Sequence, residues 1–226
     1  MSQHEIVIIA ASLVILMLSV AIHEAAHGWV ALKCGDTTAR DLGRITFNPI
    51  PHIDPFMTIL LPLVLLMSSN GAWLFGGAKP VPVLFHNLRR PWRDMTLVAL
   101  AGPASNFLLA LLFLILQRIA IEGFDMQPAW RGGAGQVLPT VLKRAVELNL
   151  LLTAFNLLPI PPLDGSRLMA WLLPEPARST FVRLERFGMI IVIGLMILGV
   201  LEHLIVPLMD GLLVIAWEIV TLGGLV

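Results

Sequence analysis

The sequence has few charged residues: 13% of its 226 residues are Asp, Glu, Lys or Arg, whereas 57% are hydrophobic. A water-soluble domain of this size has about a quarter of its residues charged, but a surface that faces lipid needs none. The formal charges cancel to zero, so the chain has no general attraction to nucleic acid or to acidic substrates. Its single cysteine, Cys34, excludes an internal disulfide. The composition therefore predicts a membrane protein.

Long apolar runs divide the chain into candidate membrane helices. Each run is long enough, or nearly so, to cross about 30 Å of hydrocarbon. The first run lacks the basic start and the cleavage site of a secretory signal, so we interpret it as a retained helix. No internal repeat and no long polar insertion is visible. We expect one all-α integral membrane domain over 1–226, a polytopic helical bundle with helices at about 6–32, 95–117, 138–158, 187–206 and 208–224.

Two proline-containing stretches, 39–55 and 76–85, are not typical of helices, because proline removes a backbone N–H. We interpret both as short strands or loops at the membrane face, where exposed backbone can pair with an extended peptide. The apolar run at 54–70 lies between them. We expect a re-entrant or hairpin segment at about 54–86 that returns to the side on which it began.

The basic residues predict the orientation of the helices. Eleven of the fifteen lie in three groups that can all face the cytoplasm, which follows the positive-inside rule. This orientation places the N-terminus outside. It also requires the segment at 54–86 to return to its starting side. The three groups are Lys33, Arg40 and Arg44; Lys79, Arg89, Arg90 and Arg93; and Arg167, Arg178, Arg183 and Arg186.

The first apolar run contains the pentad His23-Glu24-Ala25-Ala26-His27. On a helix, positions i and i+4 lie one turn apart on one face, so both imidazoles can reach one Zn²⁺ with Glu24 nearby. A bound zinc ion lowers the pKa of water to about 7, and a neighbouring carboxylate can then accept the proton. HExxH also arises by chance in soluble helices. Inside lipid, however, two histidines and a glutamate are costly unless they are functional.

Two histidines leave a tetrahedral site in need of a third protein ligand and an open position. Asp164 is the strongest candidate, because it follows a helix and a proline-rich turn on the side that His23 and His27 also approach. A turn residue before Gly165 is the alternative interpretation. The two motifs can meet only if an even number of membrane crossings separates them. The distribution of the basic residues also requires an even number.

These motifs together resemble the site-2 protease family of intramembrane zinc metalloproteases. The resemblance rests on HEAAH at 23–27 and NLLPIPPLDG at 156–165, and extends to GRITFNPIPHIDP, GGAKPVPV and AGPASN at 101–106. It implies that Asp164 is a zinc ligand and that Asn156 contacts the substrate or the developing oxyanion. Asn156 can also be explained by an interhelical hydrogen bond, and we interpret AGPASN as helix packing. Compared with some relatives, a minimal form without a PDZ or CBS domain is expected.

The sequence thus predicts a zinc-dependent intramembrane endopeptidase with one Zn²⁺ per chain. Its metal ligands are His23, His27 and Asp164, and its catalytic residues are Glu24 and Asn156. We expect a multi-pass protein of the cell membrane whose active site lies towards the cytoplasm and whose partner is a membrane protein substrate, bound as an extended strand. The alternative is a metal-binding transporter or sensor, which would also place His and Asp in lipid.

Overall fold

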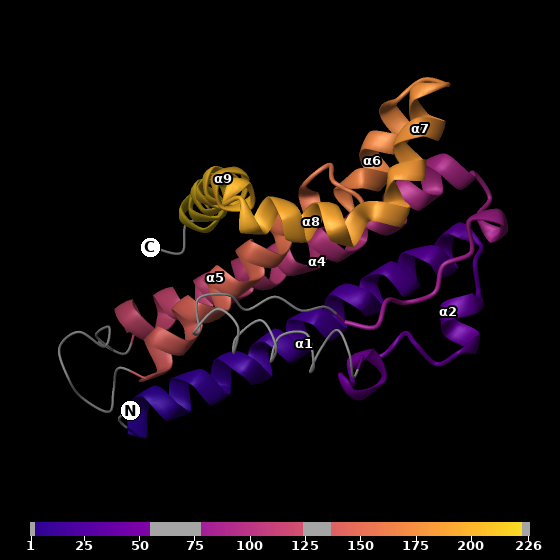
Figure 1. Cartoon of the computed structure of the whole chain (residues 1–226). Helices are drawn as coiled ribbons and strands as arrows, with labels where there is room; N and C mark the ends of the chain where they lie inside the picture. Colours follow the sequence, from indigo (N-terminus) through magenta and orange to yellow (C-terminus); the bar gives the residue numbers. More distant parts are fainter. Residues whose placement is uncertain (1–2, 55–77, 124–136, 223–226) are drawn as a thin grey trace.

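The computed structural model describes residues 3–54, 78–123 and 137–222 (Figure 1). Three long helices lie alongside one another and form its central bundle: α1 (Gln3–Cys34), α4 (Pro91–Arg118) and α5 (Val137–Leu157). Helix α4 begins with Pro91, whose missing N–H is not needed in the first turn, and continues into a wider turn at Ile119–Gly123. The central bundle positions the polar residues described below.

Small residues let the three helices of the central bundle approach closely. Ala21 of α1, Ala110 of α4 and Ala145 and Ala154 of α5 are each fully buried. In lipid there is little hydrophobic drive between helices, so close packing of small side chains is a main source of helix association. The closely packed interior therefore leaves little space, and the polar side chains inside it must find partners in the protein.

Three helical segments in the described residues are long and apolar enough to cross a membrane: Gln3–Cys34, Pro91–Gly123 and Val200–Thr221. The prediction of a helical membrane protein is therefore confirmed. Helix α5 and the shorter helix α8 (Gly188–Ile197), which were also expected to span, are not among the three. In the first half of helix α5, Lys143 and Arg144 each form an exposed ion pair with Glu147.

The expected short strands are not found in the described residues. The stretch after α1 instead forms the short helix α2 (Thr38–Asp41) and a 3₁₀ turn at Ile50–His52. Residues 78–84 are extended without a ladder partner and end in a second turn at Phe85–Asn87. The predicted re-entrant or hairpin segment at 54–86 falls mostly on 55–77, outside the described residues.

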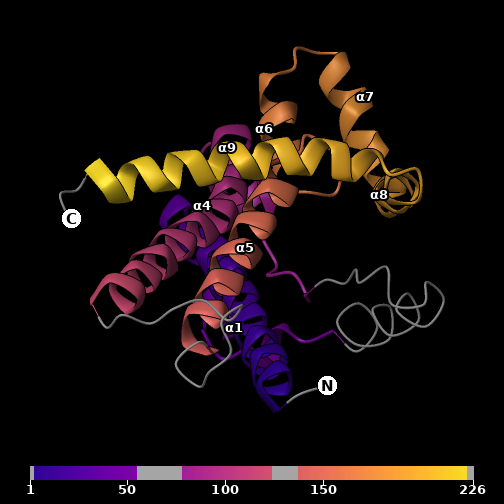
Figure 2. The same cartoon turned by 90° about the vertical axis from the view of Figure 1, so that its left-hand side faces the viewer.

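The C-terminal part forms α6 (Gly165–Leu172), α7 (Ala177–Arg183), a turn at Leu184–Phe187, α8 and α9 (Val200–Leu222). The expected boundary between helices at 206–208 is wrong. Helix α8 ends before Gly199, which has a left-handed φ of +72°, and Pro207 lies inside α9. Helix α9 crosses α4 and α5 (Figure 2), and its Ala216 and Val220 pack on Ala110 and Leu150.

Candidate metal centre

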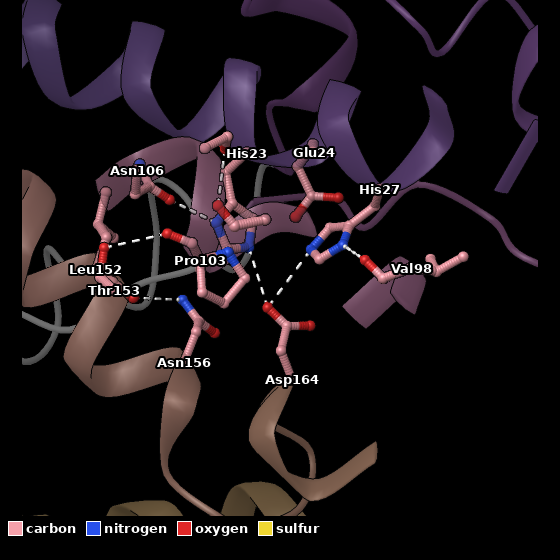
Figure 3. Close-up of polar contacts among 12 residues, drawn as sticks. His23, Glu24, His27, Val98, Pro103, Asn106, Leu152, Thr153, Asn156 and Asp164 are labelled. Carbon is pink, nitrogen blue, oxygen red and sulfur yellow. Dashed lines mark hydrogen bonds and ion pairs between the residues drawn. The ribbon is translucent and has the colours of Figure 1, made fainter. Parts of the chain in front are cut away.

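The two histidines of the pentad lie on one face of α1, one turn apart, as the spacing predicts. Their ring centroids are 4.6 Å apart with planes at 87°. His23 is 7% exposed and His27 is 9% exposed, so both imidazoles are withdrawn into the central bundle. Each Nε2 atom faces away from α1 towards the turn that precedes α6 (Figure 3).

Asp164 approaches the two histidines although it is distant from them in the sequence. Its Oδ2 lies 3.2 Å from His23 Nε2 and 3.4 Å from His27 Nε2, and the three potential ligand atoms lie within 4.8 Å of one another. The following residue makes this approach possible. A Cβ at Gly165 would lie 2.2 Å from the carbonyl oxygen of Leu157, so only glycine allows the turn to pass so close to the end of α5.

Gly102 of α4 forms the wall opposite the two histidines. A Cβ at this position would lie 2.5 Å from the Nε2 atoms of both His23 and His27. The missing side chain therefore leaves a space directly in front of the two nitrogen atoms. The AGPASN stretch was expected to serve helix packing, and this role of Gly102 was not predicted from the sequence.

The other nitrogen atom of each ring has a partner on α4. His27 Nδ1 lies 2.7 Å from the carbonyl oxygen of Val98, and His23 Nδ1 lies 2.5 Å from Oδ1 of Asn106. A backbone carbonyl only accepts hydrogen bonds, so Nδ1 of His27 carries the proton and Nε2 keeps its lone pair. Asn106 was also assigned to packing from the sequence, and its contact with His23 was not anticipated.

With these tautomers the site is arranged to bind a cation. Two imidazole lone pairs and the Asp164 carboxylate converge, and the buried Oδ2 of Asp164 has no hydrogen-bond partner in the part of the chain that the structure describes. Such groups repel one another unless a positive charge lies between them. Two histidine nitrogens and one carboxylate oxygen, with a fourth position open, are a typical donor set for a catalytic zinc ion. The residues present therefore fit Zn²⁺.

Glu24 lies beside the histidines and is held by a segment distant in the sequence. Its Oε2 accepts a hydrogen bond of 2.7 Å from the backbone N–H of Val81, in the extended stretch 78–84. Figure 3 shows the carboxylate next to the two imidazoles rather than turned away from them. The pentad thus brings together two nitrogens that could bind a metal and a carboxylate whose other oxygen has no hydrogen-bond partner among the described residues.

Comparison with known proteins agrees with this geometry. The family description that matches the chain is Peptidase family M50, over residues 11–147 and 131–201. The chain belongs to this family of peptidases. It is 37% identical to "Putative zinc metalloprotease YwhC" of Bacillus subtilis (strain 168) over 197 residues, 87% of this chain and 84% of the relative. It is 31% identical to "Putative zinc metalloprotease Rip2" of Mycolicibacterium smegmatis over 191 residues, 83% of this chain and 66% of that relative.

The family assignment confirms the predicted resemblance, since M50 is the site-2 protease family. The names of the relatives and the donor set at His23, His27 and Asp164 agree on Zn²⁺ as the cofactor. No solved structure matches the chain.

Asn156, the remaining predicted site residue, lies in the last turn of α5 next to Asp164 in this M50 peptidase (Figure 3). Its Nδ2 donates a hydrogen bond of 3.0 Å to the carbonyl oxygen of Leu152, one turn earlier on the same helix. The amide group therefore keeps a second N–H that is not used in this bond. The interhelical hydrogen bond considered as its alternative role is not the one that it makes.

Proposed function

We propose that this M50 peptidase is a zinc-dependent intramembrane endopeptidase. The proposal rests on one observation: His23, His27 and Asp164 converge between apolar helices, and the atoms that meet there carry lone pairs. Placing such groups in lipid costs free energy that a structural role does not offset. A helical substrate must be unwound first, because the carbonyl groups of a helix are hydrogen-bonded and screened by side chains.

We assign His23, His27 and Asp164 as the ligands of Zn²⁺, Glu24 as the general base and Asn156 as the oxyanion donor. When bound, Zn²⁺ supplies a Lewis acid that acidifies water and polarises a carbonyl group. The uncommitted oxygen of Glu24 accepts the proton from the attacking water and returns it to the nitrogen of the departing amine. The free N–H of Asn156 donates to the carbonyl oxygen as its negative charge grows.

The extended stretch 78–84 is the proposed binding edge for the substrate. Its prolines, Pro80 and Pro82, have no N–H, so the backbone donors that alternate with them belong to Val81 and Val83. Val81 donates to Glu24, and no hydrogen bond to the Val83 amide is found within the described residues. An extended peptide that pairs with Val83 would thus be guided towards Glu24.

A hollow next to this stretch supports the assignment. It has a volume of about 320 Å³ and is lined by Val83, Phe85, Trp92, Met95, Arg167, Ala170 and Val182. Met95 lies one turn of α4 before Val98, whose carbonyl oxygen holds His27. The hollow therefore adjoins the part of α4 that contacts His27, and we propose that it receives a large apolar side chain of the substrate.

The proposal extends to location. We infer a multi-pass protein of the cell membrane with a re-entrant or hairpin segment at about 54–86 and with the active site on the cytoplasmic side. The support is the clustering of Lys33, Arg40 and Arg44 in and just after the last turn of α1, at the end of the helix that is nearer His27. His23 and His27 lie in the second half of that helix, nearer this basic end than the N-terminus.

The decisive test compares wild type with Glu24→Gln and Asp164→Ala, purified with lipid and given a transmembrane peptide as substrate. Glu24→Gln should keep one zinc per chain while its cleavage rate falls at least ~10²-fold, because only the proton acceptor is lost. Asp164→Ala should lose both zinc and cleavage. Full cleavage by Glu24→Gln would overturn the proposal. Zinc uptake into vesicles by wild type, with no peptide cleaved, would favour a transporter instead.

A further inference from the structure

Three buried amide and imidazole groups form a chain of hydrogen bonds behind the metal centre. His23 Nδ1 meets Asn106 Oδ1, and Asn106 Nδ2 lies 3.0 Å from Oδ1 of Asn149 on α5. Asn149 Nδ2 in turn donates to the carbonyl oxygen of Ala145 over 2.9 Å. Both asparagines have no exposed surface, so each amide depends on its protein partners.

The direction of this chain is fixed at its far end. The carbonyl of Ala145 can only accept, so the NH₂ group of Asn149 must face it and its oxygen must face Asn106. The NH₂ group of Asn106 then faces Asn149 and the carbonyl oxygen of Ser19, which is 3.3 Å away. Oδ1 of Asn106 is left to face His23. In a flipped Asn106 the amide oxygen would face two other acceptors, Oδ1 of Asn149 and the carbonyl oxygen of Ser19, so both hydrogen bonds would be lost.

The orientation of Asn106 decides which nitrogen atom of His23 can bind a metal. With its oxygen towards the ring, Nδ1 carries the proton and Nε2 presents a lone pair towards Asp164. With its NH₂ group towards the ring, Nδ1 would have to accept, the proton would move to Nε2, and that atom could not bind a cation. We propose that Asn149 is a positioning residue for the metal centre, which acts through Asn106 to hold His23 in its metal-binding tautomer.

This inference rests on the proposal that His23 binds zinc through Nε2, and the test separates the two. The quantity to measure is zinc affinity, by competition with a chelator, on folded detergent-solubilised protein. Asn149→Leu, which keeps similar volume but neither polar atom, should bind zinc at least about 10-fold more weakly, since such outer partners are worth 10–100-fold in metal affinity. His23→Ala should bind zinc more weakly still.

Two further variants distinguish positioning from packing. Thr153→Val is the matched control. Thr153 lies one turn further along α5 and is 2% exposed, and within the described residues its hydroxyl donates only to the carbonyl oxygens of Pro103 and Asn149. Its zinc affinity should stay within about 3-fold of wild type. In the double variant Asn106→Leu/Asn149→Leu, affinity should fall no further than in Asn106→Leu alone, because Asn149 acts through Asn106.

Each outcome decides the matter. Unchanged affinity in Asn149→Leu, an equal loss in Thr153→Val, or fully additive losses in the double variant would overturn the positioning role and leave the proposed function standing. Unchanged zinc affinity in His23→Ala would overturn the ligand assignment itself. If Asn149→Leu does not fold, Asn149→Asp replaces it. Its buried carboxyl group, when protonated, can donate to the carbonyl oxygen of Ala145 and still accept from Asn106, so zinc affinity should stay within a few-fold of wild type. A loss like that of Asn106→Leu would contradict the inference.

Discussion

The two sides of the metal centre are held by different kinds of group, neutral on one side and charged on the other. On the inner side, between α1, α4 and α5, neutral groups hold the two histidines: the carbonyl of Val98, and the amides of Asn106 and Asn149. On the outer side, Glu24 is held by the stretch 78–84, which is itself tied down by charged side chains. Asp36 accepts from the N–H of Leu84 over 2.7 Å, and Arg44 donates to the carbonyl oxygen of Lys79 over 2.8 Å.

This difference follows from the surroundings of each side. In the interior of apolar helices a lone charge is expensive, so orientation is set by neutral donors and acceptors with fixed direction. Beyond the end of α1, carboxylate and guanidinium groups are used instead: Asp36 is buried but surrounded by hydrogen-bond donors, and Arg44 lies nearer the surface. We therefore expect changes on the inner side to be severe and insensitive to pH, and changes on the outer side to be milder and to act on the stretch 78–84.

The largest effect is expected from Gly102→Ala on the inner side. The added methyl group would lie 2.5 Å from both Nε2 atoms, where the metal ion has to bind, and the long helix α4 cannot shift without moving Val98 and Asn106. Zinc content measured by elemental analysis should fall to a small fraction of one per chain, and cleavage should fall with it. Gly194→Ala in α8 is the matched control, since nothing lies within 4 Å of its added methyl group. A Gly102→Ala variant that keeps its zinc would refute the described packing of α4 on the histidines.

A smaller effect is expected from Asp36→Asn on the outer side. Asp36 has no exposed surface, and its Oδ1 accepts from the N–H and hydroxyl of Thr38 and from Asn87 Nδ2. An asparagine can keep those bonds with its oxygen, but its NH₂ group would then face the N–H of Leu84, donor against donor. Unsatisfied groups of this kind cost about 1–3 kcal/mol.

Hydrogen exchange of the stretch 79–84 should detect this change directly. The stretch has four backbone amides, on Lys79, Val81, Val83 and Leu84, because the other two residues are prolines. Exchange at Leu84 should quicken about 10-fold or more and the KM for peptide should rise, while zinc content stays at the wild-type level. Asp41→Asn, an exposed carboxylate in α2, should change none of these. Loss of zinc in Asp36→Asn would show that the two sides of the centre are not separate.

The pH dependence of stability provides a second test of the hydrogen bonds to Asp36. Burial would raise the pKa of this carboxyl group, but hydrogen bonds from Thr38, Asn87 and the Leu84 amide outweigh burial and hold the pKa below its usual range. The stabilisation is therefore fully present above the unfolded pKa of about 3.9 and is lost as the pH falls through the folded pKa. The difference in Tm between wild type and Asp36→Asn should be constant from about pH 5 to 7 and should shrink below about pH 4.

The inner side shows what could be predicted from the sequence and what could not. The i and i+4 spacing of His23 and His27 determines their common face, because a helix has 3.6 residues per turn. The roles of Asn106 and Asn149 could not be predicted in the same way, because a buried amide can bond to any nearby group, and its partner depends on how α4 and α5 pack. The available signal was an asparagine in each of two apolar helices, each of which requires a partner in lipid.

The boundary between the C-terminal helices was predicted wrongly for a different reason. The predicted helices at 187–206 and 208–224 leave a gap at Pro207, whereas the chain breaks at Gly199 and continues through Pro207 inside α9. Membrane helices tolerate proline because neighbouring groups can satisfy the freed carbonyl. A glycine with positive φ ends a helix more sharply, but its conformation cannot be read from its identity alone.

The smallest effect is expected from Arg44→Gln, at the other end of the stretch 78–84. The guanidinium of Arg44 reaches the carbonyl oxygens of Lys79 and Pro80 at 2.8 and 3.4 Å, on the exposed side of the protein. A shorter glutamine cannot reach both, and losing a hydrogen bond of this kind costs about 1 kcal/mol. Exchange at Lys79 should quicken several-fold, with cleavage reduced by about 5-fold or less and zinc unchanged. Arg40→Gln should behave as wild type, because the Arg40 side chain is exposed and, among the described residues, pairs only with Asp41. If Arg44→Gln lowers cleavage as strongly as Gly102→Ala does, the outer side is as rigidly coupled to the metal as the inner one, and the contrast between the two sides is wrong.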